Sequence, residues 1–355
     1  MSQRHRRERS EHQTERDAWA AQTLCYGTLW GVKAIVAREA GPPEALELRE
    51  VETPHPSPNQ VLIKVAAAGV NRADLLQRQG HYQLPPGAST IIGLEVSGTV
   101  AEVGEEVSNW AIDDPCIALL AGGGYAEYVA VPAGQVVPPP LGVELVAAAA
   151  VIEVAATVYS NVEFVGLSDG DWFLVHGGAG GVGSFAIQYA KHIGATVITT
   201  AGSQDKLNYC RSIGADHAIS YHDDWPAAVR DVAADGVHMI LDNMGAKYLD
   251  DHVQLLAMDG ALVTIGMQGG RKGTLDLATL AAKRGLITAN LLRARPVEEK
   301  AAICRGLVQN VWPLIADGTI KQPPLTVFPL ADAAAAHAHL QSGNNIGKVI
   351  LSVSR

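Results

Sequence analysis

The stretch HGGAGGVGS, at residues 176–184, constrains the fold of this 355-residue chain more than any other feature. Gly178, Gly180 and Gly183 have the spacing G-x-G-x-x-G, after the apolar run WFLVH and at the start of the helix-forming run VGSFAIQYAKHIG. In a strand–loop–helix unit, such glycines allow a tight turn, close approach of a pyrophosphate to the backbone, and helix–strand packing. The stretch therefore predicts a dinucleotide site, and an ordinary strand-to-helix turn is the alternative.

The pattern of apolar residues differs on the two sides of this loop. From about residue 147, helix-forming runs alternate with short strands, expected at 172–176, 196–201, 216–221, 237–245, 261–267 and 286–292. Before residue 137, short β-branched runs are separated by Gly- and Pro-rich turns, with one helix expected at 72–78. These patterns predict an α/β fold that combines a small β-barrel with a doubly wound parallel sheet of the Rossmann type.

The length of the chain predicts more than one hydrophobic core. We assign residues 32–153 to the first part of a β-barrel domain and 154–295 to the dinucleotide-binding domain. Residues 296–355 are expected to return to the first domain as a helix and a final strand. Residues 1–31 are polar and mixed in charge, and they are expected to form a disordered extension.

Composition narrows the classes of function. The formal net charge is −10 and no long basic run occurs, which disfavours a nucleic-acid partner. The longest apolar run, at 145–159, contains Glu153 and is shorter than a membrane span, so no membrane segment is expected. The four cysteines are widely spaced, as in a protein of the reducing cytoplasm. No HExxH motif occurs, which leaves chemistry carried by a nicotinamide.

The residues after the second strand of the parallel sheet predict which nucleotide binds. An NAD site usually has an acid at this strand end, whereas TVITTA runs into Gly202 and Ser203. Ser203, Lys206 and Tyr221 could converge on a 2′-phosphate, so we predict NADPH. Asp205, next to Lys206, complicates this prediction because its carboxylate would repel a phosphate. Alternatively, Lys206 is a solvated helix residue and Tyr221 a half-buried aromatic at a strand end.

Several longer stretches carry a family resemblance, and they span roughly residues 32–353: AGVNRADLLQRQGHYQLPPGASTIIGLEVSGTVAEVG, GGGYAEYVAVP, HGGAGGVGSFAIQYAK, TAGSQDKLNYCRSIGAD, ANLLRAR and NNIGKVIL. The chain resembles the zinc-free quinone oxidoreductase branch of the medium-chain dehydrogenase/reductase superfamily. Within that branch it is most similar to the tumour-suppressor-inducible NADPH:quinone oxidoreductase subgroup. The resemblance implies that the β-barrel is a GroES-like catalytic domain. It also implies an enzyme that reduces quinones or α,β-unsaturated carbonyls, and we expect a homodimer.

The resemblance also implies roles for single residues. It places Asn71 and Tyr82 beside the substrate, Thr157 near the nicotinamide and Asn345 at the cofactor. Gly181 and Val182 join the three motif glycines in the cofactor loop. From the residues alone, Asn71 could equally be a turn or cap residue, Tyr82 a loop aromatic, and Thr157 a residue facing its own helix.

Two departures from family patterns are visible. Zinc-dependent members have cysteine at the position of Asn71 and histidine at that of Leu94, before Glu95. A catalytic zinc needs three Cys, His or carboxylate ligands, so we predict an enzyme without metal. The second departure is Asp113-Asp114-Pro115, where relatives usually have a Gly-Asp turn.

Two other functions stay open at this point. One is an enoyl reductase that acts on an acyl thioester. The other is a non-catalytic NADPH-binding protein that senses redox state or associates with RNA, although the net charge disfavours the RNA version.

Overall fold

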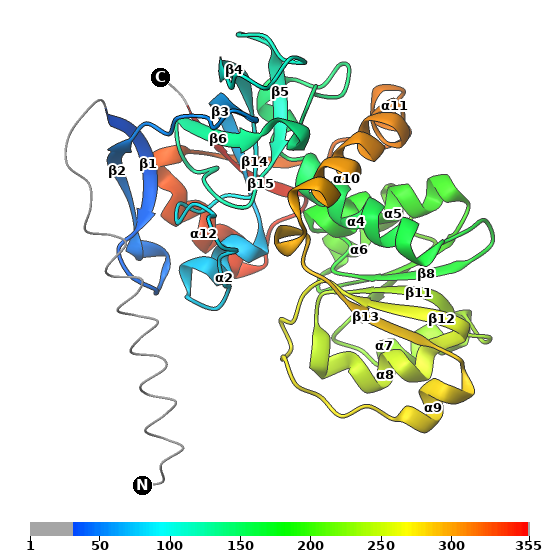
Figure 1. The fold of residues 1–355 in the computed structure, drawn as a ribbon. Helices are drawn as coiled ribbons and strands as arrows, with labels where there is room; N and C mark the ends of the chain where they lie inside the picture. Colours follow the sequence, from blue (N-terminus) through cyan, green and yellow to red (C-terminus); the bar gives the residue numbers. More distant parts are fainter. Residues whose placement is uncertain (1–30, 354–355) are drawn as a thin grey trace, which may run out of the picture.

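The computed structural model describes residues 31–353, and within them the chain forms a β-rich part and an α/β part (Figure 1). Each part contains its own main sheet, so the predicted combination of a GroES-like barrel and a Rossmann sheet is confirmed. The extension predicted at 1–31 lies outside the described residues except for Gly31, which begins the first strand.

The β-rich part is built on one long central strand, β3. The main sheet has the order β14-β15-β3-β4-β5-β7, and β6 also pairs with β3. Strands β1 and β2 form a separate antiparallel pair. The elements of this part are β1 (Gly31–Ala37), η1 (Pro43–Ala45), β2 (Leu46–Glu52), β3 (Gln60–Val70), α2 (Arg72–Arg78), β4 (Glu95–Val103), β5 (Pro115–Leu119), β6 (Tyr128–Pro132), η2 (Ala133–Gln135) and β7 (Val136–Val137).

The C-terminal segment adds to this same sheet. It comprises α10 (Val297–Asn310), α11 (Trp312–Ala316), β14 (Leu325–Pro329), η5 (Leu330–Asp332), α12 (Ala333–Ser342) and β15 (Lys348–Ser352). β15 runs antiparallel to β3, with Val349 opposite Val70. The residues around 70 and 348, far apart in sequence, therefore lie side by side where the β-rich part meets the α/β part (Figure 1).

The α/β part holds a parallel sheet of order β10-β9-β8-β11-β12-β13. Its elements are α3 (Leu145–Ala148), α4 (Ile152–Val165), β8 (Trp172–His176), α5 (Gly181–Ile193), β9 (Thr196–Ala201), α6 (Gln204–Ser212), β10 (His217–Ser220), α7 (Trp225–Val232), β11 (Val237–Asp242), η3 (Gly245–Tyr248), α8 (Leu249–Leu255), β12 (Leu256–Thr264), α9 (Leu277–Ala282), β13 (Leu286–Ala289) and η4 (Leu292–Ala294). β11 ends three residues earlier than expected because the Asp242 carboxylate accepts the Met244 and Gly245 N–H groups and turns the chain.

Alternate residues of the central strands enter two different cores. Phe173 and Val175 of β8 pack in the core shared with α4, α5 and α10. Leu174 points to the opposite core, beneath α7 and α8. Both faces of the sheet are thus covered, which explains why these strands read as continuous apolar runs.

The apolar segment that opens the α/β part is longer than the sequence pattern indicated. Residues 145–165, which include α3 and α4, are long and apolar enough to cross a membrane, so the expectation that this run is too short was wrong. About two thirds of it is buried inside the protein, between the two sheets and α10. Its apolar character is therefore accounted for by packing. The predicted domain boundary at 153/154 falls inside α4 and stays a prediction.

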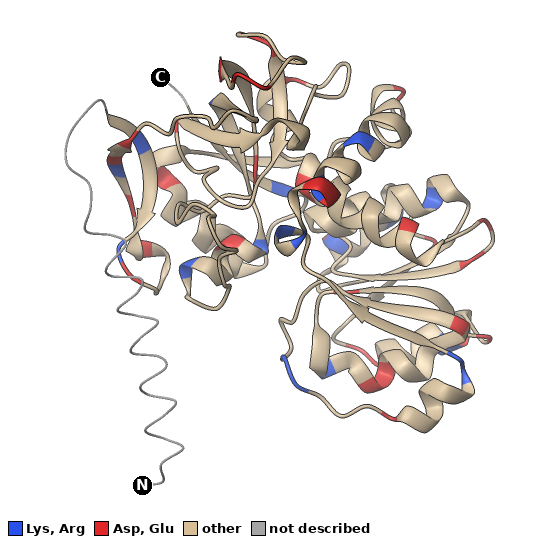
Figure 2. Cartoon of the chain, viewed as in Figure 1, with Lys and Arg blue, Asp and Glu red and all other residues tan. Residues whose placement is uncertain are grey.

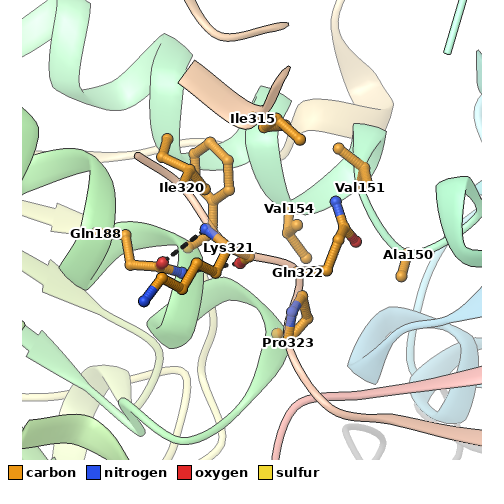
Figure 3. Close-up of a pocket in the computed structure, with 11 residues that line it drawn as sticks. Ala150, Val151, Val154, Gln188, Ile315, Ile320, Lys321, Gln322 and Pro323 are labelled. Atoms are coloured by element: carbon orange, nitrogen blue, oxygen red, sulfur yellow. Dashed lines mark hydrogen bonds between the residues drawn. The ribbon is translucent and has the colours of Figure 1, made fainter. Parts of the chain in front are cut away.

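One small cavity lies beside this segment, between α4, α5 and the chain at 320–323 (Figure 3). Its volume is about 20 Å³, which is room for one water. The Gln188 amide closes one side, because it accepts from the Lys321 N–H at 2.8 Å and donates to the Lys321 carbonyl at 3.1 Å. A dinucleotide cannot occupy a space of this size, so this cavity is not the cofactor site.

Candidate functional site at the junction of the two parts

The three motif glycines differ in the space around them. A Cβ on Gly178 would lie 2.1 Å from Thr199 Oγ1, and one on Gly183 would lie 2.3 Å from the Gly177 carbonyl oxygen. Packing alone therefore excludes side chains at these two positions. A Cβ on Gly180 would meet nothing nearer than 3.5 Å. Gly180 is the N-cap of α5, so the open space lies where a helix N-terminus presents free N–H groups to an anion.

The C-terminal segment closes over this loop. The Gly347 N–H donates to the Ala179 carbonyl at 2.7 Å, and Gly347 forms a bridge with Gly180. Asn345, two residues away, is half-buried, and its amide donates to the Gly347 carbonyl at 3.4 Å. The structure thus brings Asn345 next to the glycine loop. Its role in cofactor binding stays a prediction.

Gly181 and Val182 occupy the first turn of α5. A Cβ on Gly181 would lie 3.0 Å from Lys348 Cδ and 3.3 Å from Val154, so this position is filled from the protein side. Val182 is half-buried and packs on the core between the sheet and α4. The two residues set the position of the helix N-terminus against α4 and β15.

The three residues predicted at the adenosine end lie close together. Ser203 is the N-cap of α6, and its hydroxyl accepts from the Lys206 N–H at 3.4 Å. The Tyr221 hydroxyl lies against Gly202, where a Cβ would approach it to 2.1 Å. The Lys206 ammonium donates to the Gly343 carbonyl, and burial lowers the pKa of Lys206. Asp205 is exposed, so no buried carboxylate faces a ribose here.

Asn71 belongs to a buried charged cluster at the junction. It is the N-cap of α2, as the cap alternative stated, and the Asp74 carboxylate accepts its N–H at 2.7 Å. Its side chain turns elsewhere: Nδ2 donates to Glu95 Oε1 at 3.0 Å and Oδ1 accepts from Lys348 Nζ at 2.5 Å. Since an ammonium can only donate, Lys348 fixes which way the Asn71 amide faces.

The Lys348 ammonium contacts the side chain of Asn71, one of the two positions at which the resemblance implies metal ligands in zinc-dependent relatives. The ammonium also lies 2.7 Å from Glu95 Oε1, with 4% of the lysine side chain and none of the glutamate exposed. Leu94 is buried and offers no donor atom. No group of three His, Cys, Asp or Glu within residues 31–353 could hold a metal ion. A divalent cation here would meet the Lys348 charge at close range, so these residues do not fit zinc.

Glu153 is a site residue that the sequence analysis missed. Its backbone N–H donates to Glu95 Oε2 at 3.0 Å, and its carboxyl accepts from the predicted Thr157 hydroxyl at 3.4 Å. The side chain is partly accessible, yet protein surrounds it closely enough that desolvation raises its pKa to about 7. Thr157 therefore faces Glu153 on its own helix, as the alternative stated, and Glu153 in turn contacts Glu95 of the buried cluster. The i,i+4 spacing of Glu153 and Thr157 was the available signal.

Tyr82 lies in the segment between α2 and β4, close enough to Glu153 and Asp74 for their charges to act on its hydroxyl. Its ring stacks on the Arg293 guanidinium, with 5.2 Å between Arg293 Cζ and the ring centroid. Burial raises the pKa of Tyr82 to about 12, so the hydroxyl keeps its proton at neutral pH. Within residues 31–353 the hydroxyl has no hydrogen-bond partner. It is therefore free to donate to a bound molecule.

A second buried network fixes α2 against α12. Tyr125 Oη donates to Asp74 Oδ2 at 3.0 Å and lies 3.1 Å from His337 Nε2. Arg78 Nη1 donates to His337 Nδ1 at 3.3 Å, so the ring proton is on Nε2. Burial, and then the Arg78 charge, lower the pKa of His337 to about 3, so the ring is neutral at physiological pH. This network holds the helix that Asn71 caps.

Fold and site together define a class of protein: two-domain chains with a glycine loop suited to a dinucleotide where a Rossmann sheet meets a GroES-like domain. Family models agree in both halves, with an alcohol dehydrogenase GroES-like domain at residues 57–141 and a zinc-binding dehydrogenase domain at 181–304. The chain belongs to the medium-chain dehydrogenase/reductase superfamily.

Individual relatives differ in what they do. The chain is 30% identical to the human synaptic vesicle membrane protein VAT-1 homolog over 322 residues, covering 86% of this chain and 82% of that one. It is 27% identical to a 2-haloacrylate reductase of a Burkholderia species, covering 90% and 98%. It is also 32% identical to a phenolphthiocerol/phthiocerol polyketide synthase of Mycobacterium tuberculosis. That match covers 87% of this chain but only 14% of the synthase.

Solved structures share the whole fold. The quinone oxidoreductase of Escherichia coli, solved with NADPH, superimposes with a TM-score of 0.81 at 27% identity, covering 91% of this chain and all of that one. A mycobacterial protein solved with NADPH gives a TM-score of 0.83 at 30% identity, again covering 91% and 100%. Both of these similar structures therefore hold NADPH in the fold that this chain shares.

Proposed function

We propose that the protein reduces quinones or α,β-unsaturated carbonyls with NADPH, without a metal, as a member of the quinone oxidoreductase branch. The tumour-suppressor-inducible subgroup is our proposal for its place within that branch. The observation that carries the proposal is the free Tyr82 hydroxyl beside a buried Asn71–Glu95–Lys348 cluster, at the junction that also bears the glycine loop.

The residues around the glycine loop fit a dinucleotide. Gly180 leaves open space at the N-terminus of α5, and Asn345 lies next to that loop. Lys206, Ser203 and Tyr221 gather at the end of β9 without a buried acid, which favours a 2′-phosphate over a free ribose. When bound, the reduced nicotinamide supplies the hydride.

The chain's own groups can polarise the acceptor and hold a proton. The Tyr82 hydroxyl, and the second N–H of Asn71 Nδ2, are donors for the oxygen on which negative charge develops. Glu153, with a pKa of about 7, can hold a proton near that oxygen and replace one that Tyr82 gives up. Thr157 fixes the Glu153 carboxyl through its hydroxyl.

We further propose that a second copy pairs along β13, the edge strand of the parallel sheet. Its outer edge is free within the described residues, and Leu286 and Leu291 beside it are exposed. A cytoplasmic location is proposed from the widely spaced cysteines, of which Cys116, Cys210 and Cys304 are buried thiols. Among residues 31–353, Lys and Arg are scattered over both halves in the view of Figure 2, in keeping with a small-molecule partner.

An enoyl reductase acting on a thioester is the second candidate, because the synthase relative is similar over most of this chain. The deciding experiment follows NADPH absorbance with quinones, simple enones and an enoyl thioester. The protein should be dialysed against a chelator and measured for zinc. Turnover of quinones or enones by zinc-free protein supports the proposal. Turnover of the thioester alone favours the second candidate, and a requirement for stoichiometric zinc contradicts the metal-free mechanism.

A further inference from the structure

Arg293 is a buried guanidinium that the proposed mechanism does not use. It lies on η4, just after β13 ends at the carboxyl edge of the parallel sheet, and it is only 4% exposed. Its Nε donates to the Ala121 carbonyl at 2.6 Å. Nη1 and Nη2 are buried and have no hydrogen-bond partner among residues 31–353. Buried charged donors without partners are strongly unfavourable, so this pair of nitrogens indicates a place for an acceptor.

A second cation lies next to the first. Lys300 is also 4% exposed, and its ammonium donates to the main-chain carbonyl of Arg293 at 3.5 Å. Burial, and then the Arg293 charge, lower the pKa of Lys300. None of the ion pairs among residues 31–353 includes either side chain. Two buried positive charges without a paired carboxylate create a local field that favours an anion.

The nearest acid does not neutralise this pair. Asp74 interacts with Arg293 only at longer range, and its Oδ2 is engaged by the Asn71 N–H and the Tyr125 hydroxyl. Asp74 Oδ1 has no partner within the described residues. The Arg293 guanidinium therefore forms no ion pair with Asp74, which leaves Nη1 and Nη2 available for a bound group.

Tyr82 connects this guanidinium to the reaction site. Its ring covers one face of Arg293, and its free hydroxyl is the donor assigned above to the acceptor. The segment that carries it, residues 79–94, contains no helix or strand. A small molecule that accepts a hydrogen bond from the Tyr82 hydroxyl would therefore bind beside the ring that packs on Arg293.

We propose that Arg293, reinforced by Lys300, binds the carboxylate of the acceptor, so that the preferred substrates are α,β-unsaturated carboxylates. The planar fork of Nη1 and Nη2 matches the two carboxylate oxygens. This inference rests on the proposed NADPH-dependent reduction. In that reaction the β-carbon gains the hydride of NADPH, the α-carbon gains the proton that the Tyr82 hydroxyl gives up and Glu153 replaces, and the C=C bond becomes single. The carboxylate is unchanged, and one NADPH becomes NADP⁺ for each acceptor reduced.

The test compares 2-chloroacrylate with its uncharged methyl ester. The unmodified enzyme should show a KM at least about tenfold lower for the acid than for the ester. Arg293→Gln should raise the KM for the acid about tenfold to a hundredfold and leave that for the ester nearly unchanged. Arg293→Lys keeps the charge but loses the planar pair of nitrogens, so its KM for the acid should lie between those of the unmodified enzyme and Arg293→Gln. Arg284→Gln is the matched control, because Arg284 pairs with Asp259 on the surface.

A binding measurement separates this inference from the proposed function. Saturated 2-chloropropionate should raise the melting temperature of the NADP⁺-loaded enzyme and of Arg284→Gln, but not that of Arg293→Gln. The inference is overturned if the unmodified enzyme favours the ester, or if Arg293→Gln loses both substrates equally. If quinones are reduced while neither carboxylate binds, the inference fails and the proposed function stands. If nothing is reduced, the function fails, and the shift with 2-chloropropionate still decides whether Arg293 binds carboxylates.

Discussion

The ammonium of Lys348 lies 2.7 Å from Glu95 Oε1 in a place where neither side chain meets solvent. The two residues are 253 positions apart, and the pairing of β15 with β3 brings them together. Two buried charges are tolerated only because each satisfies the other and Asn71 completes the set. This ion pair fastens the C-terminal segment to the first domain beside the glycine loop.

Lys348→Met should therefore destabilise the protein by about 3–5 kcal/mol, because it leaves the Glu95 charge buried without a partner. The double variant with Glu95→Gln should recover part of that loss. Denaturant titration measures both. Arg284→Gln, which breaks an exposed pair, should lower stability far less, because solvent screens that pair. Equal losses for the buried and exposed pairs would show that Lys348 is not a structural cation.

The glycine loop allows a matched pair of substitutions. Gly178→Ala should lower stability by about 1–3 kcal/mol, since its Cβ would clash with Thr199 Oγ1. Gly180→Val should leave the cofactor-free protein nearly as stable as the parent, yet raise the KM for NADPH and NADH together, because the side chain fills the space at the N-terminus of α5. Melting curves and cofactor titrations check the two results. A Gly180→Val enzyme with unchanged cofactor affinity would contradict the assigned site.

Cofactor choice should depend on Lys206. Lys206→Ala should raise the KM for NADPH about tenfold and leave NADH almost unaffected, because a partly exposed cation contributes near the low end of charged hydrogen bonds. The ratio of kcat/KM for the two cofactors is the measurement. Lys191→Ala removes the same charge at the far end of α5, where Lys191 pairs with Asp216, and should not change the ratio. A parent enzyme that prefers NADH would contradict the NADPH proposal.

Acid stability should depend on buried histidines. Burial lowers the pKa of His252 from 6.5 to about 3, so this ring is neutral when folded and takes up a proton when unfolded. Its contribution is fully present above pH 6.5 and is lost as the pH falls towards 3, by up to about 2 kcal/mol at pH 5. Asp242, whose pKa burial raises to about 6, acts in the opposite direction, because its contribution is lost as the pH rises.

Comparison of variants isolates the histidine effect. The unfolding free energy of His252→Phe should fall less between pH 7 and pH 5 than that of the parent protein. His222→Gln, at an exposed position, should keep the parent's dependence. The same slope in His252→Phe and the parent would show that His252 is not responsible.

The loop at Asp113 offers a stabilising substitution. Asp113 has a φ of +70°, a left-handed conformation that favours glycine. Asp113→Gly should raise the unfolding free energy by about 0.5–1 kcal/mol, and Asp113→Ala should lower it. Thermal melts of the two variants decide the sign. If Ala proves at least as stable as Gly, backbone strain is not what limits this turn.

The sequence by itself determined the fold class, the strand–loop–helix unit and most strand positions. It could do so because these depend on local features, namely apolar period, glycine spacing and turn residues. The runs at 172–176 and 196–201 became β8 and β9, and the expected helix at 72–78 became α2. Asn71 as a cap and the crowding of Gly183 by Gly177 also follow from neighbours in the chain, whereas Gly178 is crowded by Thr199 of β9.

Only the tertiary structure decided which charges are buried together. Lys348 and Glu95, or Arg293 and Tyr82, meet because sheet pairing and domain contact join segments more than 200 residues apart. Glu153 reads in the sequence as an interruption of an apolar run, and its raised pKa arises from the residues that fold around it. Burial and long-range electrostatics depend on all neighbours at once, and no local pattern encodes them.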